Sequence, residues 1–290
     1  MSQQLRPRRS VLFMPGANQR ALAKARTLSA DAIILDLEDA VAPDAKHIAR
    51  ANVVAAVRAG GYGAREVNVR INPLNSAWGQ DDLDAIATLP IDGLVLPKVE
   101  SVEMVNELSD ALRSRGQSLP IWAMMETPIA ILRVADIALH APGLGCLLMG
   151  TSDLSKDLRL PPETPVAGLM WSLSQCVVAA RAAGLDIIDG VHLDLADDAG
   201  FRAACQRANA LGFDGKSLIH PTQIAMSNAT FGQTPAQIAL AQRVVDAYTQ
   251  ALRQGAGIAV LDGKLVENLH VEQAQRTIAL AQATAALGFD

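Results

Sequence analysis

The amino-acid sequence predicts one (β/α)₈ barrel followed by a C-terminal helical extension. Half of the 290 residues are apolar, enough for a large core, and α/β barrels of this length commonly form one domain. Eight short apolar runs recur along the chain, and stretches with helical periodicity separate most of them. No G-x-G-x-x-G motif follows the first run, which disfavours an open, doubly wound sheet.

The expected strands are apolar on both faces, as in a parallel sheet that helices cover on both sides. In chain order they are Val11–Met14, Ala32–Leu35, Glu66–Ile71, Gly93–Leu96, Ile121–Met125, Cys146–Met149, Asp186–Ile188 and Gly215–Ile219. Eight strands that alternate with helices are typical of a closed TIM barrel.

Two of the connecting helices have clear sequence signals. Pro43 begins the first, the apolar residues of 49–57 share one face, and Gly60 follows its end. Ser101 is a good N-cap for the second, and Gly116 ends it.

The end of the chain does not continue the repeat. We expect a barrel domain over residues 1–232 and an extension over residues 233–290. The extension is predicted to hold a helix (Pro235–Arg253), a glycine-containing segment (255–263) and a final helix (Val271–Ala286). It could pack on its own chain or reach a neighbouring subunit.

Composition excludes several classes of protein. A net charge of −5 lacks the positive field of a nucleic-acid-binding protein. No apolar run reaches the roughly 18 residues of a membrane span, and the start does not resemble a signal peptide. The three cysteines fit no metal motif and are expected to be buried free thiols in a reducing compartment. We therefore expect a cytoplasmic protein with neither a membrane nor a nucleic acid as partner.

Charged residues gather where the expected strands end, which is where barrels of this type place their active sites. They are Asp36, Glu38, Asp39, Arg70, Lys98, Glu126 and Asp153. Glu126 and Asp153 follow adjacent strands, so their carboxylates could converge on one Mg²⁺, an ion that typically takes one or two carboxylates. Asp36, Glu38 and Asp39 could act on the ion through water.

Other residues at these strand ends could bind an anionic substrate. Arg70 is a plausible anchor for a carboxylate, because its planar fork matches that group with two hydrogen bonds. Gly150 and Thr151 could bring backbone N–H groups to the same anion. Lys98 either belongs to the site or neutralises Glu38 or Glu100.

Some polar and aromatic residues have simpler structural interpretations. His192 and His220 are expected to be hydrogen-bonded strand-end residues, and Asp39 could cap the turn before Pro43. Trp78 lies in a polar loop, where it could pack locally or cover the site.

The chain resembles the citrate lyase β-subunit-like group of acyl-CoA lyases, within the HpcH/HpaI aldolase superfamily that also holds the malyl-CoA lyases. The resemblance extends over nearly the whole chain. Its motifs are Arg9–Gly16, Leu35–Val41, Val69–Asn72, Leu96–Glu100, Glu126–Pro128, Gly150–Leu154, Lys216–Pro221 and Asp262–Glu267. Their order and spacing are specific for the superfamily but not for one substrate.

The resemblance implies roles for the predicted site residues. Glu126 and Asp153 would bind Mg²⁺, Arg70 would bind substrate oxygens, and the backbone of Gly150 and Thr151 would bind a keto acid's carboxylate.

It also implies contacts outside the metal site. Arg20 and Lys24 would lie near the CoA part. Relatives form trimers or hexamers, and in some the C-terminal segment covers a neighbouring site and contributes an acid/base carboxylate. Glu267 stands where the family often has Asp, so it is a candidate acid/base.

The expected activity is Mg²⁺-dependent cleavage of a 3-hydroxyacyl-CoA carboxylate, of the malyl-CoA or citramalyl-CoA type, to acetyl-CoA and a 2-keto acid. Arg70 would stabilise the enolate and Glu267 would protonate it. Three alternatives stay open: a citrate lyase β subunit that cleaves a citryl thioester to oxaloacetate, a malyl-CoA thioesterase, and a non-catalytic barrel that binds CoA esters or keto acids.

Overall fold

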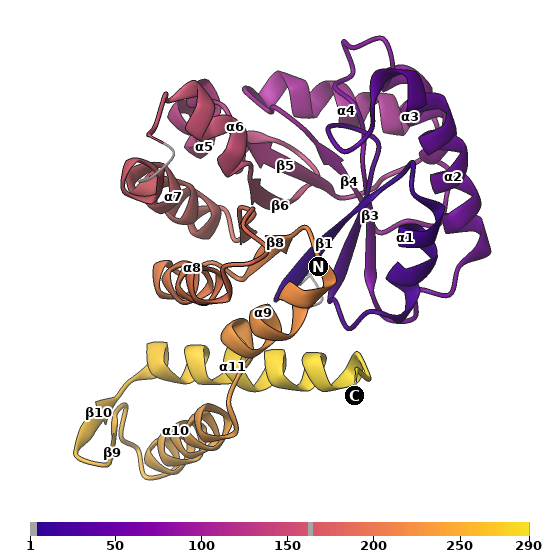
Figure 1. Ribbon diagram of the computed structural model, residues 1–290. Helices are drawn as coiled ribbons and strands as arrows, with labels where there is room; N and C mark the ends of the chain where they lie inside the picture. The colour runs from indigo at the N-terminus through magenta and orange to yellow at the C-terminus, as the bar shows by residue number, and fades with distance from the viewer. Residues whose placement is uncertain (1–4, 162–164, 290) are drawn as a thin grey trace. The chain divides into compact units, whose positions relative to one another are not determined.

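The computed structural model describes residues 5–161 and 165–289, and it contains a closed barrel of eight parallel strands (Figure 1). Each strand pairs with the next, and the last pairs with the first. The strands are β1 (Ser10–Pro15), β2 (Ala32–Asp36), β3 (Glu66–Arg70), β4 (Gly93–Leu96), β5 (Ile121–Met125), β6 (Leu144–Met149), β7 (Asp186–Asp189) and β8 (Gly215–Leu218). The predicted fold class is confirmed, and the predicted strand ends differ by at most two residues.

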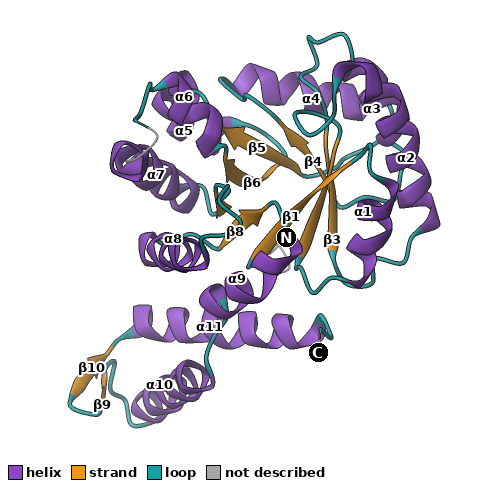
Figure 2. Ribbon diagram, in the orientation of Figure 1, coloured by secondary structure: helices purple, strands orange, loops and turns teal. Residues whose placement is uncertain are grey.

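Helices lie around the outside of these strands (Figure 2). The α-helices are α1 (Gln19–Lys24), α2 (Lys46–Ala59), α3 (Gly79–Ile86), α4 (Val102–Ser114), α5 (Pro128–His140), α6 (Thr151–Asp157), α7 (Pro165–Ala182), α8 (Asp198–Leu211) and α9 (Ile224–Phe231). Three short 3₁₀ helices, η1 (Ala25–Thr27), η2 (Pro43–Ala45) and η3 (Pro221–Gln223), join them.

The expected helix ends are mostly confirmed. Gly60 and Gly116 have φ values of 63° and 71°, a left-handed conformation that suits glycine after a helix. Ser101 occupies the N-cap position of α4, but its hydroxyl does not cap the helix. It bonds the Glu103 side chain instead, so the expected capping bond is absent there.

Apolar side chains fill the middle of the barrel. They include Val11, Ile34, Val95, Trp122 and Leu148, all fully buried. A polar site can therefore form only above or below this layer. All three cysteines are buried and free, as predicted. In the described part of the chain, no helix is long and apolar enough to cross a membrane.

Ion pairs close the end of the barrel where the strands begin. Arg8 donates to Glu66 and Asp186, each at 2.8 Å, and its guanidinium lies 4.8 Å from the centre of the Trp122 ring. Because these charges are paired with one another, the three ionised groups can stay largely buried. The opposite end is left for the cavity described below.

The chain divides into two compact units, one over residues 8–230 and one over residues 231–289 with the described part of residues 1–7. The second unit contains α10 (Pro235–Arg253) and α11 (Asn268–Ala286). Between them, β9 (Ala259–Leu261) and β10 (Lys264–Val266) form an antiparallel hairpin, where the sequence predicted only a glycine-containing segment over residues 255–263.

The hairpin turn consists of Asp262 and Gly263, with φ values of 52° and 75°. Two positive φ values are characteristic of the tight turn that Asp-Gly favours. The final helix also begins earlier than predicted, at Asn268.

Candidate active site

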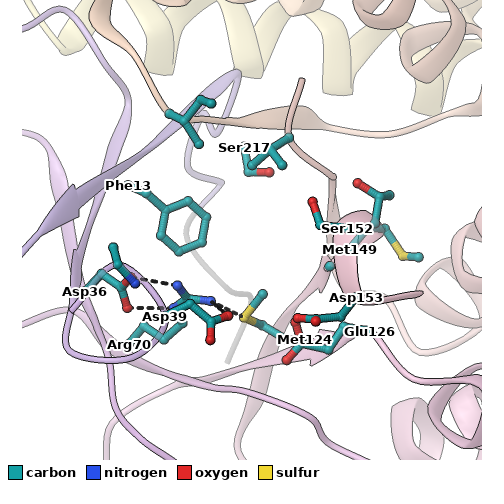
Figure 3. A pocket seen from close by; sticks show the side chains of 15 residues that line it. Phe13, Asp36, Asp39, Arg70, Met124, Glu126, Met149, Ser152, Asp153 and Ser217 are labelled. Carbon is teal, nitrogen blue, oxygen red and sulfur yellow. Dashed lines mark hydrogen bonds and ion pairs between the residues drawn. The ribbon is translucent and has the colours of Figure 1, made fainter. Parts of the chain in front are cut away.

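A cavity of about 340 Å³ lies at the end of the barrel where the strands terminate (Figure 3). Its lining is formed by Phe13, Asp36, Asp39, Ala40, Arg70, Met124, Glu126, Met149, Gly150, Thr151, Ser152, Asp153, Val191, Ser217 and Ile219. Seven residues that the sequence placed at the strand ends meet here: Asp36, Asp39, Arg70, Glu126, Gly150, Thr151 and Asp153. The barrel topology brings them together, because parallel strands end at the same rim.

Glu126 and Asp153 lie side by side on one wall of the cavity (Figure 3). Glu126 follows β5 directly and is only 2% exposed, while Asp153 is half-buried in the first turn of α6. One Glu126 oxygen, Oε1, accepts a hydrogen bond from the Lys98 backbone at 2.7 Å. The pair offers oxygen ligands of the kind that hard divalent cations prefer.

Gly150 is needed for this arrangement. A β-carbon at this position would overlap the Glu126 side chain, so any larger residue would displace the carboxylate. The Gly150 N–H donates to the Met125 carbonyl at 3.1 Å and is not available to a substrate, contrary to the prediction. Thr151 is the first residue of α6, so its N–H lies outside the helical bonding pattern and remains a candidate donor.

Arg70 is held by Asp36 on the opposite wall. Its Nε and Nη2 atoms donate to the two Asp36 oxygens at 2.7 and 2.6 Å, and its guanidinium lies 4.8 Å from the Phe13 ring centre. The two-point contact with a substrate carboxylate is therefore already used inside the protein. Nη1 is the guanidinium nitrogen that Asp36 does not bind. It lies 3.0 Å from Glu38 and 3.7 Å from Asp39, and it donates to Met124 Sδ at 3.6 Å.

Lys98 links the two walls. Its Nζ donates to Glu38 Oε1 at 2.8 Å, which settles the choice between Glu38 and Glu100. Asp36 also accepts hydrogen bonds from the backbone of Glu38 and Ala40. Asp36 and Glu38 thus have protein partners and orient the site through Arg70 and Lys98.

The conformation of Lys98 provides a direct test of this linkage. The Lys98 backbone has a left-handed φ of 49°, a conformation that costs a residue with a side chain about 1–2 kcal/mol. In this conformation the Lys98 N–H donates its hydrogen bond to Glu126. Lys98→Gly should keep the bond and relieve the strain, so it should be about 1 kcal/mol more stable than Lys98→Ala. Urea unfolding of both variants measures the difference, and equal stability of the two would contradict the role of the backbone.

Burial raises the pKa of Glu126 to about 7, against the opposing effects of the Lys98 N–H and the Arg70 charge. A cation must bind the ionised form, so it competes with a proton below pH 7. We expect Mg²⁺ affinity measured by calorimetry to fall about tenfold from pH 8 to pH 6. Affinity that does not change over this range would show that Glu126 is not a ligand.

Five predicted site residues lie outside the cavity lining, and two of them, Glu38 and Lys98, are tied to it through the contacts given above. Arg20 and Lys24 are exposed on α1. Glu267 belongs to the C-terminal unit, where it caps α11 and its backbone N–H donates to His270 Nδ1 at 3.0 Å.

The structural interpretations of other polar residues are partly confirmed. His220 caps η3, whereas His192 packs against Phe201, and its buried Nε2 has no hydrogen-bond partner among the described residues. Trp78 packs locally, with its ring centre 5.2 Å from Lys46 Nζ. Asp39 lines the cavity and does not cap η2, whose N-cap is Ala42.

Sequence reasoning missed the wall formed by β7 and β8. Lys216 is 2% exposed and donates to Asp189 at 2.5 Å and to the Gly190 carbonyl at 2.6 Å. Ser217, which lines the cavity, donates to the Asp189 carbonyl at 2.9 Å. A lysine inside an apolar strand requires a buried partner, and that was the available signal.

Comparison with known proteins identifies the family. The family model for HpcH/HpaI aldolase/citrate lyase matches residues 9–221, and the chain belongs to this family. A (3S)-malyl-CoA thioesterase from Cereibacter sphaeroides (strain KD131 / KCTC 12085) is 45% identical over 286 residues, covering 99% of both chains. A citrate lyase subunit beta from Leuconostoc mesenteroides subsp. cremoris is 34% identical, covering 96% of this chain and 94% of that protein.

Solved structures agree with the family and the fold. The chain is similar to CitE from Mycobacterium tuberculosis, crystallised in complex with magnesium, acetoacetate and coenzyme A (TM-score 0.76, 29% identity, 96% of this chain and 98% of that chain). The citrate lyase beta subunit of M. tuberculosis complexed with oxaloacetate and magnesium has a TM-score of 0.68 and 31% identity, with 78% and 97% coverage. Magnesium is therefore found in solved relatives of this chain, as predicted for the family.

Proposed function

We propose that this protein is a Mg²⁺-dependent thioesterase that hydrolyses a malyl-CoA-type ester, a 3-hydroxyacyl-CoA with a carboxylate. The main support is 45% identity to a (3S)-malyl-CoA thioesterase over 99% of both chains. The citrate lyase subunit beta quoted above is less similar, at 34% identity. The lyase expected from the sequence therefore becomes the second candidate.

The acidic wall suits a magnesium ion. Glu126 is buried and has one backbone N–H as its hydrogen-bond donor in the described structure, a poor environment for an isolated negative charge. A cation held by Glu126 and Asp153 would compensate both carboxylates. Mg²⁺, when bound, supplies positive charge that polarises the oxygens of a carbonyl or carboxylate.

The rest of the cavity suits a short, charged acyl chain. Arg70 Nη1 and the Thr151 N–H would bind the acyl group's carboxylate, one donor from each wall. Met124, Met149 and Val191 would contact the carbon skeleton and limit the entry of water. Arg20 and Lys24 remain proposed contacts for the phosphates of CoA.

The domain and subunit arrangement also remains a proposal. In it, the barrel of residues 1–232 carries the reaction, and the extension of residues 233–290 covers the site of a neighbour in a trimer or hexamer. In this arrangement Glu267 would reach the neighbour's substrate from its position as the N-cap residue of α11.

Product analysis tests the proposed activity. The purified protein is incubated with malyl-CoA and Mg²⁺, with an EDTA sample as the control. We expect free CoA and malate in equal amounts, and neither with EDTA. Acetyl-CoA and glyoxylate would instead identify a lyase.

A carbon–carbon lyase is the second candidate, because solved relatives are complexed with keto acids such as oxaloacetate and acetoacetate. A citrate lyase β role would require turnover of a citryl thioester on a carrier protein. Binding of CoA esters without turnover would support the non-catalytic alternative.

A further inference from the structure

The cavity and its rim contain five acidic side chains, and their surroundings differ. Asp36 accepts hydrogen bonds from Nε and Nη2 of Arg70. Glu38 is paired with Lys98 and with Arg70 Nη1. Glu126 and Asp153 form the wall that we assign to the cation. Four of the five carboxylates therefore have either a protein cation or the proposed metal as partner.

Asp39 is the fifth, and it is placed differently. Its side chain lines the cavity, is 58% exposed, and lies beside Arg70, apart from the Glu126–Asp153 pair (Figure 3). In the described residues its nearest cation is Arg70 Nη1 at 3.7 Å, which is too far for a hydrogen bond. Its oxygens are thus free to accept a hydrogen bond from a water molecule in the cavity.

The loop that carries Asp39 is firmly held. Its own N–H donates to Glu38 Oε2 at 3.0 Å, and the next N–H, of Ala40, donates to Asp36 Oδ2 at 3.1 Å. Lys46 Nζ donates to the carbonyls of Leu37 and Glu38 at 2.8 and 2.7 Å. A side chain without a hydrogen-bond partner on a fixed backbone is suited to a reacting group, because the backbone already positions it.

We infer that Asp39 is the general base that activates water for thioester hydrolysis, an inference that rests on the proposed function. The carboxylate takes a proton from water as the water oxygen bonds to the thioester carbonyl carbon. The carbon–sulfur bond then breaks, and protonated Asp39 returns the proton to the departing sulfur. The products are CoA thiol and the free carboxylic acid, which releases its remaining proton to solvent and becomes a carboxylate.

Substitution of Asp39 tests this role against a matched control. Asp39→Asn and Asp39→Ala remove the base, whereas Asp44→Asn removes an exposed acid from η2 that does not line the cavity. We measure CoA release from malyl-CoA at saturating Mg²⁺, and Mg²⁺ binding by calorimetry. Both Asp39 variants should lose about 10²- to 10⁴-fold in kcat with Mg²⁺ affinity kept within about threefold, and Asp44→Asn should match the wild type.

Chemical rescue separates a reacting group from a structural one. Formate should restore CoA release to Asp39→Ala by about tenfold or more, because a small carboxylate can occupy the vacated space. It should not restore Asp39→Asn, whose amide still fills that space.

Two outcomes would overturn the inference while leaving the thioesterase intact: an Asp39→Asn enzyme with wild-type kcat, or loss of turnover in step with loss of Mg²⁺ binding. Failure of the wild-type protein to release CoA would overturn the proposed function itself, and the inference with it.

Discussion

Glu126→Gln should abolish Mg²⁺ binding and lower turnover at least a thousandfold, equivalent to about 4 kcal/mol of lost stabilisation of the transition state. It should also stabilise the metal-free protein. The pKa of Glu126 is raised from 4.5 to about 7, so its ionisation in the folded state costs about 3 kcal/mol above pH 7. This cost fades as pH falls below 7. Glutamine keeps the shape of the side chain and removes the charge.

Three measurements on this variant are needed together: calorimetry with Mg²⁺, CoA release, and thermal unfolding at pH 8 in EDTA. Asp157→Asn, at the exposed end of α6, is the matched control and should behave as the wild type. Unaltered Mg²⁺ affinity in Glu126→Gln would show that the cation is held elsewhere. Lower stability in EDTA would show that the buried carboxylate is better compensated than its surroundings indicate.

Arg70→Met should cause the largest loss of stability of any change in the site. Arg70 is a buried cation that contacts Asp36 and Glu38, and removing it leaves two buried carboxylates without their main partner. Breaking a buried ion pair on one side typically costs about 3–5 kcal/mol. CoA release should be lost as well, because Nη1 is the proposed contact for the acyl carboxylate.

A double variant separates the two effects. Arg70→Met with Asp36→Asn removes one of the unpaired charges, so it should regain part of the stability in urea unfolding but none of the activity. Arg70→Lys keeps a charge without the fork and should lie between the wild type and Arg70→Met. An Arg70→Met protein that unfolds at the wild-type urea concentration would contradict this view of the cluster.

The barrel could be predicted because its signals are local. Parallel strands covered by helices are apolar along their whole length, and Gly60 and Gly116 mark helix ends. The Asp-Gly pair at 262–263 is an equally local signal for a hairpin, and it forms the turn between β9 and β10. The positions of Glu126 and Asp153 followed from the topology, because adjacent parallel strands end together.

The partners of the site residues could not be predicted in the same way. Whether Arg70 offers its fork to a substrate depends on Asp36, which lies 34 residues away in sequence. The Gly150 N–H was assigned to a substrate, but it extends the pairing of β5 and β6. A side chain at a strand end has several possible neighbours, and only the packed structure selects among them.

A crystal structure of the protein with Mn²⁺ in place of Mg²⁺, grown with malate, tests the central claim most directly. We predict anomalous scattering from one Mn²⁺ between Glu126 and Asp153, with malate in the cavity lined by Arg70 and Thr151. A Mn²⁺ ion bound away from these two carboxylates, or malate bound outside this cavity, would contradict the proposed site.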